Sequence, residues 1–176
     1  MIAVGHRALL KLFRLLPRRA RRLVVRVLTP SFTVGAICII EREDGAVLLV
    51  RQVYRRGWGL PGGLMQRREG IDDCARREVR EEVGIPIELV GEPGVVVDPD
   101  PRRIDVVYRA RPAAGADPAA ATPSSPEIAE VRWFPTQELP ELQHETVSAL
   151  VALARLGSLT SIHPRLRQLS GEQRGS

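Results

Sequence analysis

The sequence is poor in the residues that mark several classes of protein. It has two cysteines, Cys38 and Cys74, and their spacing forms neither a disulfide framework nor a metal-ligand motif. Both lie in apolar, patterned segments, which predicts two small core residues in a reducing compartment. No apolar run approaches the roughly 18 residues that a membrane span requires. We therefore expect a cytoplasmic protein, with a peripheral position at a membrane as the alternative.

Acidic residues are absent from the first 30 positions, which hold eight basic side chains. The formal net charge of +5 therefore comes from the ends of the chain, because residues 31–150 carry a net charge of −6. A basic total that arises in this way is weak support for a nucleic-acid-binding domain, and no specific nucleic acid is expected as a partner. The balance of 44% hydrophobic and 27% charged residues indicates a globular fold.

Residues 6–28 have a helical pattern that is interrupted near Pro17. Apolar residues alternate with arginines, which is typical of a basic amphipathic helix, and the small-residue cleavage site of a secretory signal is missing. Two interpretations stay open for residues 1–28. Helical apolar stripes usually pack against their own domain or a dimer partner. Eight cations without an acid also suit a peripheral membrane contact.

The remaining pattern predicts alternating strands and helices. Residues 1–30 form an N-terminal helical extension, residues 31–157 form one domain, and residues 158–176 form a polar tail that we expect to be flexible. Asp44-Gly45 is a tight-turn signal, which predicts a hairpin between the first two strands. The loop over residues 112–126 is rich in Ala and Pro, which predicts flexibility. Strands are expected over residues 32–40, 47–53, 87–97, 104–109 and 128–134, and helices over residues 71–83 and 145–156.

The helix predicted over residues 71–83 carries three acids on its apolar side. At about 100° per residue, Glu78, Glu81 and Glu82 fall in the apolar arc, whereas most of the helix's arginines fall opposite. Like charges at these spacings repel one another, and turning them towards an apolar interior adds to the cost. The acids could pair with arginines on a solvated surface, or they could bind a divalent cation. Gly62-Gly63 just upstream favours the cation, because a backbone carbonyl can approach an ion there.

Residues 63–85 carry a family signature. Gly63 is followed after five residues by Glu69 and after seven more by Arg77-Glu78-Val79-Arg80-Glu81-Glu82-Val83-Gly84-Ile85. This segment resembles the Nudix box, GX5EX7REUXEEXGU, at every fixed position. Residues 58–63 and 131–140 also resemble the strands and the turn that flank the box. The resemblance covers roughly residues 31–157 and leaves the N-terminal helix unexplained.

The resemblance implies an α/β (α+β) fold, a Nudix-like α/β/α sandwich with a central mixed β-sheet. It also implies an enzyme, a Nudix hydrolase that acts on acid anhydrides. We expect Mg²⁺-dependent hydrolysis of a pyrophosphate bond in a nucleoside diphosphate linked to another moiety, so the partner would be a small nucleotide-type substrate. Mn²⁺ is the alternative metal.

The resemblance also assigns roles to the residues of the box. Glu69 and Arg77 match the pair that braces the loop and the helix. The general base varies within the family: it is either a box acid, here Glu78, Glu81 or Glu82, or an acid from a later loop. Glu127 and Glu130 are the later candidates beside the loop over residues 112–126, and an ordinary loop acid is an equal interpretation for them. Arg51 could reach a phosphate from the second strand, although an exposed strand arginine is an equal interpretation. The positions that match metal ligands are the Gly63 carbonyl and the carboxylates of Glu78, Glu81 and Glu82.

The substrate stays open at this level. ADP-ribose hydrolases of the family often carry a proline near the position of Pro101, but a proline in this Pro-rich turn carries little weight. Nucleoside triphosphates and sugar nucleotides are equal alternatives. A catalytically silent Nudix domain that senses a nucleotide or binds a partner is the competing function, and the intact set of acids argues against it.

Overall fold

The computed structural model describes residues 13–29 and 31–156, and the chain divides into two compact units, residues 1–32 and 33–176. In the first unit, helix α2 spans Arg18–Leu28 and begins directly after Pro17, so the interruption expected there is confirmed. The part of the predicted helix before residue 13 and the predicted flexible tail lie outside the described residues. Among the helices that are described, none is both long and apolar enough to cross a bilayer.

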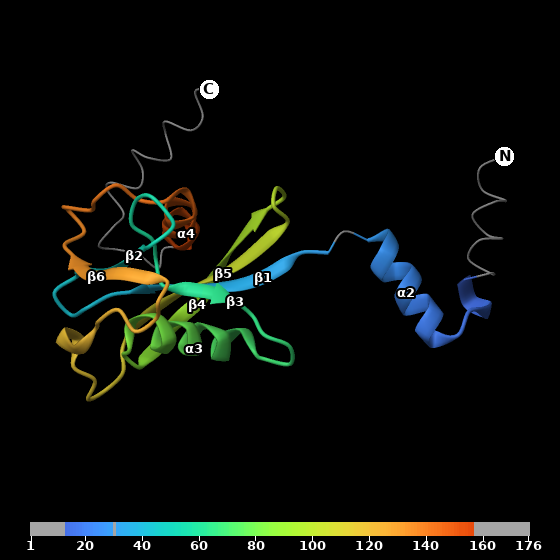
Figure 1. Ribbon diagram of the computed structural model, residues 1–176, viewed down its shortest axis with the longest axis horizontal. Coiled ribbons are helices and arrows are strands. Elements are labelled where there is room, and N and C mark those ends of the chain that lie inside the picture. Colours follow the sequence, from blue (N-terminus) through green and yellow to red (C-terminus); the bar gives the residue numbers. More distant parts are fainter. Residues whose placement is uncertain (1–12, 30, 157–176) are drawn as a thin grey trace, which may run out of the picture. The chain divides into compact units, whose positions relative to one another are not determined.

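The second unit is built around a mixed sheet (Figure 1). Four strands pair in the order β3-β1-β5-β4, and β1 runs parallel to β5 whereas the other pairs are antiparallel. Strands β2 and β6 form a second, antiparallel pair. The bounds are Thr33–Ile40 for β1, Val47–Gln52 for β2, Gly62–Leu64 for β3, Ile87–Asp98 for β4, Arg103–Pro112 for β5 and Ile128–Phe134 for β6.

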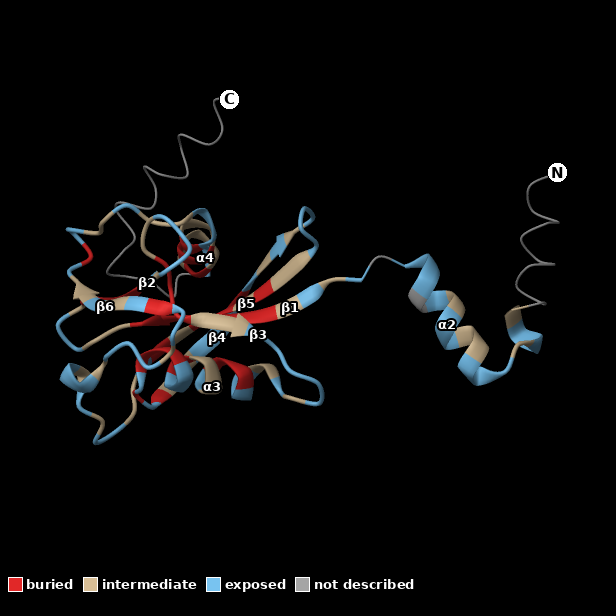
Figure 2. Cartoon of the chain, viewed as in Figure 1, coloured by how far each residue is buried: buried red, intermediate tan, exposed pale blue. Residues whose placement is uncertain are grey.

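One helix packs on each side of these strands. Successive side chains of a strand point to opposite faces, so Cys38 and Ile40 of β1 join one apolar cluster whereas Ile37 and Ile39 join another. The first cluster includes helix α3, Ile71–Val83, and the second includes helix α4, His144–Arg155. Figure 2 shows buried residues along the strands and on the inner sides of both helices. The expected mixed central sheet between helical layers is therefore confirmed.

Two expectations for the strands are wrong. Strands β1 and β2 do not form the hairpin predicted from Asp44-Gly45, because only the bridge between Glu41 and Val47 joins them. The edges of β1 are taken by β3 and β5, and β2 pairs with β6 instead. The strand that enters the box was expected over residues 58–63, yet β3 begins only at Gly62, extends to Leu64 and pairs with β1. These pairings are long-range, so local turn signals cannot indicate them.

Helix α3 ends where the sequence predicts. Gly84 adopts φ 77°, the left-handed conformation that favours glycine, and its N–H donates to the Arg80 carbonyl. The loop over residues 112–126 donates hydrogen bonds to the C-terminal end of α3. The backbone N–H of Ser124 donates to the Glu82 carbonyl at 2.9 Å and that of Thr122 to the Val83 carbonyl at 3.1 Å. The loop was expected to be flexible. It contains a 3-10 helix, Pro118–Ala120, and its N–H groups bind the last carbonyls of the helix that carries the acids, which need donors from outside the helix.

Candidate active site

A cleft of about 400 Å³ opens where β3, the C-terminal half of α3 and the loop after β2 meet. It joins segments that are far apart in sequence, since its wall also includes residues that precede β6 and begin α4. Its polar and charged lining residues are Gln52, Tyr54, Arg55, Glu78, Glu82, Arg103, Glu127, Gln143, Glu145 and Thr146. Four carboxylates and two guanidinium groups therefore face one cavity.

Two glycines form the floor of the cleft and have different constraints. A Cβ at Gly62 would lie 2.2 Å from the backbone oxygen of Ala36, so β3 could not pair with β1 at this distance. A Cβ at Gly63 would lie 2.4 to 2.5 Å from the carboxyl atoms of Glu78. The first glycine is required by the sheet. The second allows a carboxylate of α3 to approach the backbone of β3.

Glu82 is the buried acid of the site. It keeps 7% of its surface exposed, and its Oε2 accepts a hydrogen bond of 2.9 Å from the Gly62 N–H. The pKa of Glu82 is raised from its usual 4.5 to about 7, chiefly by burial and also by the charges of Glu78, Glu127 and Glu81, whereas the Gly62 hydrogen bond acts against the shift. A group whose charged form is disfavoured by neighbours of the same sign marks a place that suits a cation.

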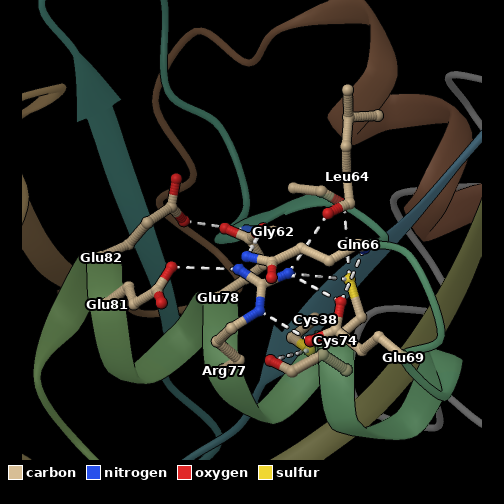
Figure 3. A network of polar contacts seen from close by, with 12 residues as sticks. Cys38, Gly62, Leu64, Gln66, Glu69, Cys74, Arg77, Glu78, Glu81 and Glu82 are labelled. Atoms are coloured by element: carbon tan, nitrogen blue, oxygen red, sulfur yellow. Dashed lines mark hydrogen bonds and ion pairs between the residues drawn. The ribbon is translucent and has the colours of Figure 1, made fainter.

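Arg77 forms ion pairs with the three other acids of the box, Glu69, Glu78 and Glu81 (Figure 3). Its Nε donates to Glu69 Oε1 at 2.7 Å, and its Nη1 donates to Glu78 Oε1 at 2.8 Å and to Glu81 Oε2 at 3.0 Å. Its Nη2 also donates to the Leu64 carbonyl at 3.2 Å. The Arg77 guanidinium lowers the pKa of Glu69 to about 2. The arginine thus connects the loop before α3 with two of its acids.

The three predicted metal-binding acids are arranged unequally. Glu82 accepts a hydrogen bond from the Gly62 N–H, whereas Glu78 and Glu81 accept hydrogen bonds from Arg77. Glu81 lies at the rim, with 56% of its side chain exposed, rather than in the apolar arc expected for it. Within residues 13–29 and 31–156, no three acids, histidines or cysteines converge on a common point as the ligands of an ion would. The donors are all oxygen atoms, however, as a hard cation requires.

Glu127 and Glu130 differ in their surroundings. Glu127 lines the cleft, and Tyr54 Oη donates to its Oε2 at 3.2 Å. Glu130 is not part of the cleft lining, because it pairs with Arg51 at 2.9 Å and also with Arg132. Arg51, expected to reach a phosphate, is exposed on β2 and also lies outside the cleft lining. The structure therefore brings Glu127 to the box acids and leaves Arg51 and Glu130 apart.

Sequence reasoning missed several residues of the cleft. Arg55 lines it and pairs with Glu145 at 3.0 Å, and Arg103 lines it while its Nε donates to Asp105 at 2.8 Å. Gln52 lines it too, and its buried Oε1 has no hydrogen-bond partner within the described residues. A usable signal existed for Arg55, because Tyr54-Arg55-Arg56 interrupts an apolar region directly after β2. Nothing local indicates Gln52 or Arg103.

The two cysteines are core residues beside the site, as expected. Both are free and buried, and Cys38 Sγ contacts the Ala75 carbonyl whereas Cys74 Sγ contacts the Gly63 carbonyl. Burial raises the pKa of Cys38 to about 12 and that of Cys74 to about 11. The thiols stay protonated at neutral pH, so their function is to fill the space between β1 and α3.

Comparison with known proteins agrees with this geometry. The model of the NUDIX domain matches residues 31–154. A MutT-like protein of Streptomyces ambofaciens is 29% identical over 143 residues, which cover 81% of this chain and 87% of the relative. The crystal structure of a MutT NUDIX hydrolase from Burkholderia pseudomallei has a TM-score of 0.58 and 27% identity, covering 70% of this chain and 99% of that one. An ADP-ribose pyrophosphatase structure from Streptococcus suis has a TM-score of 0.56 and 26% identity, covering 70% and 88%.

The matched region contains every strand of the sheet, the box and most of helix α4. The chain therefore belongs to the Nudix family of hydrolases. The relatives carry different names, MutT-like protein and ADP-ribose pyrophosphatase, so the resemblance supports hydrolysis of a pyrophosphate and leaves the attached group open.

Proposed function

We propose that this chain hydrolyses the pyrophosphate bond of a nucleoside diphosphate linked to another group. One observation carries the proposal: Glu82 is buried against the Gly62 N–H with three more carboxylates acting on it. In the absence of a ligand this arrangement costs stability, because burial disfavours a charge that no cation offsets. A site that is costly by itself but complementary to a charged ligand is typical of function rather than of packing.

The donors of the site suit a divalent cation. The Gly63 carbonyl and the carboxylates of Glu78, Glu81 and Glu82 would hold Mg²⁺, with Mn²⁺ as the alternative. The Arg77 contacts to Glu78 and Glu81 must be exchanged for contacts to the ion. When bound, the ion would neutralise charge on the diphosphate as water attacks phosphorus.

The chain's own residues would supply binding and proton transfer. Glu127 is the candidate base, because it lies in the cleft and Tyr54 orients its carboxylate. Glu69 and Arg77 would position the box acids without contacting substrate. Arg51 was expected to bind a phosphate, but Arg55 and Arg103 are better placed because they line the cleft.

Gln52 would form a hydrogen bond with the part of the substrate beyond the phosphates. Its side-chain amide faces the cleft, and its Oε1 is buried without a hydrogen-bond partner among the described residues. Because the Oε1 atom is buried, the side chain would rotate towards the cleft to accept a hydrogen bond from a donor group of a ligand. This bond would satisfy a polar atom that is costly to leave unpaired. A nucleobase or a sugar hydroxyl carries such a donor. ADP-ribose, a nucleoside triphosphate and a sugar nucleotide all fit this description.

A catalytically silent, nucleotide-sensing domain is the second candidate. The observation that favours it is the Arg77 contact to both Glu78 and Glu81, which balances these charges without any ion. A sensor would bind nucleotide through Arg55 and Arg103 and would leave the pyrophosphate intact.

A substrate panel with Mg²⁺ separates the two candidates. Wild type, Glu82→Gln and the control Glu92→Gln, an exposed acid of β4, are incubated with ADP-ribose, nucleoside triphosphates and sugar nucleotides. We expect phosphate or nucleoside monophosphate release by wild type and by the control, with little release by Glu82→Gln. Binding of a nucleotide without hydrolysis by any of the three proteins would support the sensor instead.

A further inference from the structure

Helix α2, Arg18–Leu28, separates its charged from its apolar residues, with Val25 as the exception. By sequence position, its five arginines fall on one side of the helix: Arg18, Arg19, Arg21, Arg22 and Arg26. At about 100° per residue, an apolar arc fills the opposite side. The members of this arc are Ala20, Leu23, Val24, Val27 and Leu28.

Most of the apolar arc of α2 is exposed. Leu23, Val27 and Leu28 keep 62%, 72% and 77% of their surface accessible, whereas Ala20 and Val24 are partly buried. Val25, which falls among the arginines, keeps 48%. Figure 2 shows no buried residue in this helix, in contrast to α3 and α4. A contiguous exposed apolar surface with a polar rim marks an interaction site, because such a surface is costly in water.

The charged side chains of α2 and of the residues next to it in sequence are all positive. The first 30 residues hold eight basic side chains and no acid, and the first turn of α2 has no acid either. A matching partner therefore needs an apolar layer and a negative layer side by side. We propose that α2 binds the surface of a bilayer that contains anionic lipid, with its apolar arc in the acyl-headgroup boundary and its arginines among the phosphates.

Other partners satisfy only one of these requirements. A nucleic acid would pair with the arginines and leave Leu23, Val27 and Leu28 in water. A second copy of α2 would cover the apolar arc and bring a second set of cations without acids. The lipid surface offers both layers at once, which is why the observations favour it.

Cosedimentation of the full chain with vesicles tests the proposal. Vesicles of phosphatidylcholine with phosphatidylserine are compared with vesicles of phosphatidylcholine alone. We expect binding to the mixed vesicles at least tenfold tighter than to the neutral ones, and weaker binding as salt is raised, since salt screens the cations. The double variant Leu23→Glu/Val27→Glu should lose most of the binding. The matched control Val95→Glu/Val97→Glu, two exposed valines of β4, should keep it.

A second variant distinguishes loss of lipid binding from unfolding of helix α2. Arg18→Gln/Arg22→Gln leaves the apolar arc intact, and circular dichroism checks that both α2 variants keep their helix content. We expect this variant to lose the preference for phosphatidylserine. Hydrolysis of soluble substrate should be unchanged in both variants, so failure of this proposal is distinguishable from failure of the proposed activity.

Three outcomes overturn the proposal. The first is equal binding to mixed vesicles by wild type and Leu23→Glu/Val27→Glu. The second is tighter binding of wild type to an RNA oligonucleotide than to the vesicles, which assigns the arginines to nucleic acid. The third is sedimentation velocity that shows a dimer without lipid, dissociated by Leu23→Glu/Val27→Glu, which assigns the apolar arc to a second copy.

Discussion

Helices α3 and α2 depart from the pattern of an ordinary surface helix in opposite directions. A surface helix buries an apolar stripe and exposes its charges. Helix α3 buries a charge, because Glu82 lies on the side that packs against the sheet. Helix α2 exposes its apolar residues, because Leu23, Val27 and Leu28 lie in solvent.

Each departure identifies the ligand that would remove its cost. A buried acid among other acids is relieved by a cation, and an exposed apolar arc beside arginines is relieved by an apolar layer with anionic groups. Changes to α3 should therefore alter catalysis and metal binding. Changes to α2 should alter neither, which separates the functions of the two units.

The largest effect on activity is expected from substitution of Glu82, the buried acid of α3, and Glu81, the exposed acid, serves as the comparison. Glu82→Gln should reduce kcat/KM on the order of 10²- to 10³-fold, the range for loss of one preorganised electrostatic group. Glu81→Gln should have a smaller effect, because Glu81 is largely exposed and is held by Arg77. Steady-state kinetics with saturating Mg²⁺ measures both, and equal losses would show that burial does not distinguish these acids.

The two glycines of β3 should separate folding from activity. Gly62→Ala should destabilise the protein strongly, because its Cβ would meet the Ala36 backbone oxygen, which cannot move without shifting β1. Gly63→Ala should leave the fold intact and reduce activity, because its Cβ meets only the flexible end of Glu78. Thermal unfolding and kinetics of both variants check this. A Gly63→Ala protein with wild-type activity would remove Glu78 from the metal site.

Most of the fold could be predicted from the sequence, and the reasons are local. The apolar arc and the Gly84 stop define α3, and the run of apolar and β-branched residues over 32–40 predicts strand β1. The pairing of β2 with β6 could not be predicted, because it depends on contacts about 80 residues apart rather than on the Asp44-Gly45 turn.

Only part of the site could be predicted, because some of its residues meet through contacts between segments far apart in the sequence. The box acids follow from the spacing of the Nudix box, whereas Glu127 was a candidate only because it follows the loop over residues 112–126. Arg55, Arg103 and Gln52 reach the cleft only because the tertiary fold brings β2, β5 and α3 together. Arg51 illustrates the limit: it is one residue from Gln52, and alternation along β2 points it to the other side.

Between about pH 4.5 and pH 7, Glu82 of α3 should make stability depend on pH. The folded-state pKa of Glu82 is raised from 4.5 to about 7, so the folded protein retains a proton that the unfolded chain has released. In chelator, stability should therefore fall as pH rises from about 4.5 to 7, and then level off with respect to this group. Glu82→Gln should lack this fall and melt higher than wild type at pH 8, by roughly 2 to 4 °C for each 1 kcal/mol relieved.

Thermal unfolding in chelator from pH 5 to pH 8 measures this effect. Identical pH dependence in wild type and Glu82→Gln would contradict the account of the buried acid. Added Mg²⁺ should abolish the fall in wild type, because a bound cation favours the charged carboxylate.

The smallest effect is expected for α2. Leu23→Glu/Val27→Glu should change the melting temperature of the second unit by about 1 °C or less, because exposed substitutions usually stay within about 0.5 kcal/mol. Differential scanning calorimetry without lipid measures it. A drop of several degrees would show that the apolar arc packs within the protein in solution.

Calorimetric titration of Mg²⁺ and Mn²⁺ into chelator-treated protein at pH 8 measures whether Glu82 binds a metal ion, and it needs no knowledge of the substrate. We expect saturable binding to wild type, binding at least tenfold weaker to Glu82→Gln, and unchanged binding to Leu23→Glu/Val27→Glu. Binding of equal strength to wild type and Glu82→Gln would contradict the assignment of the buried acid of α3 to a metal ion.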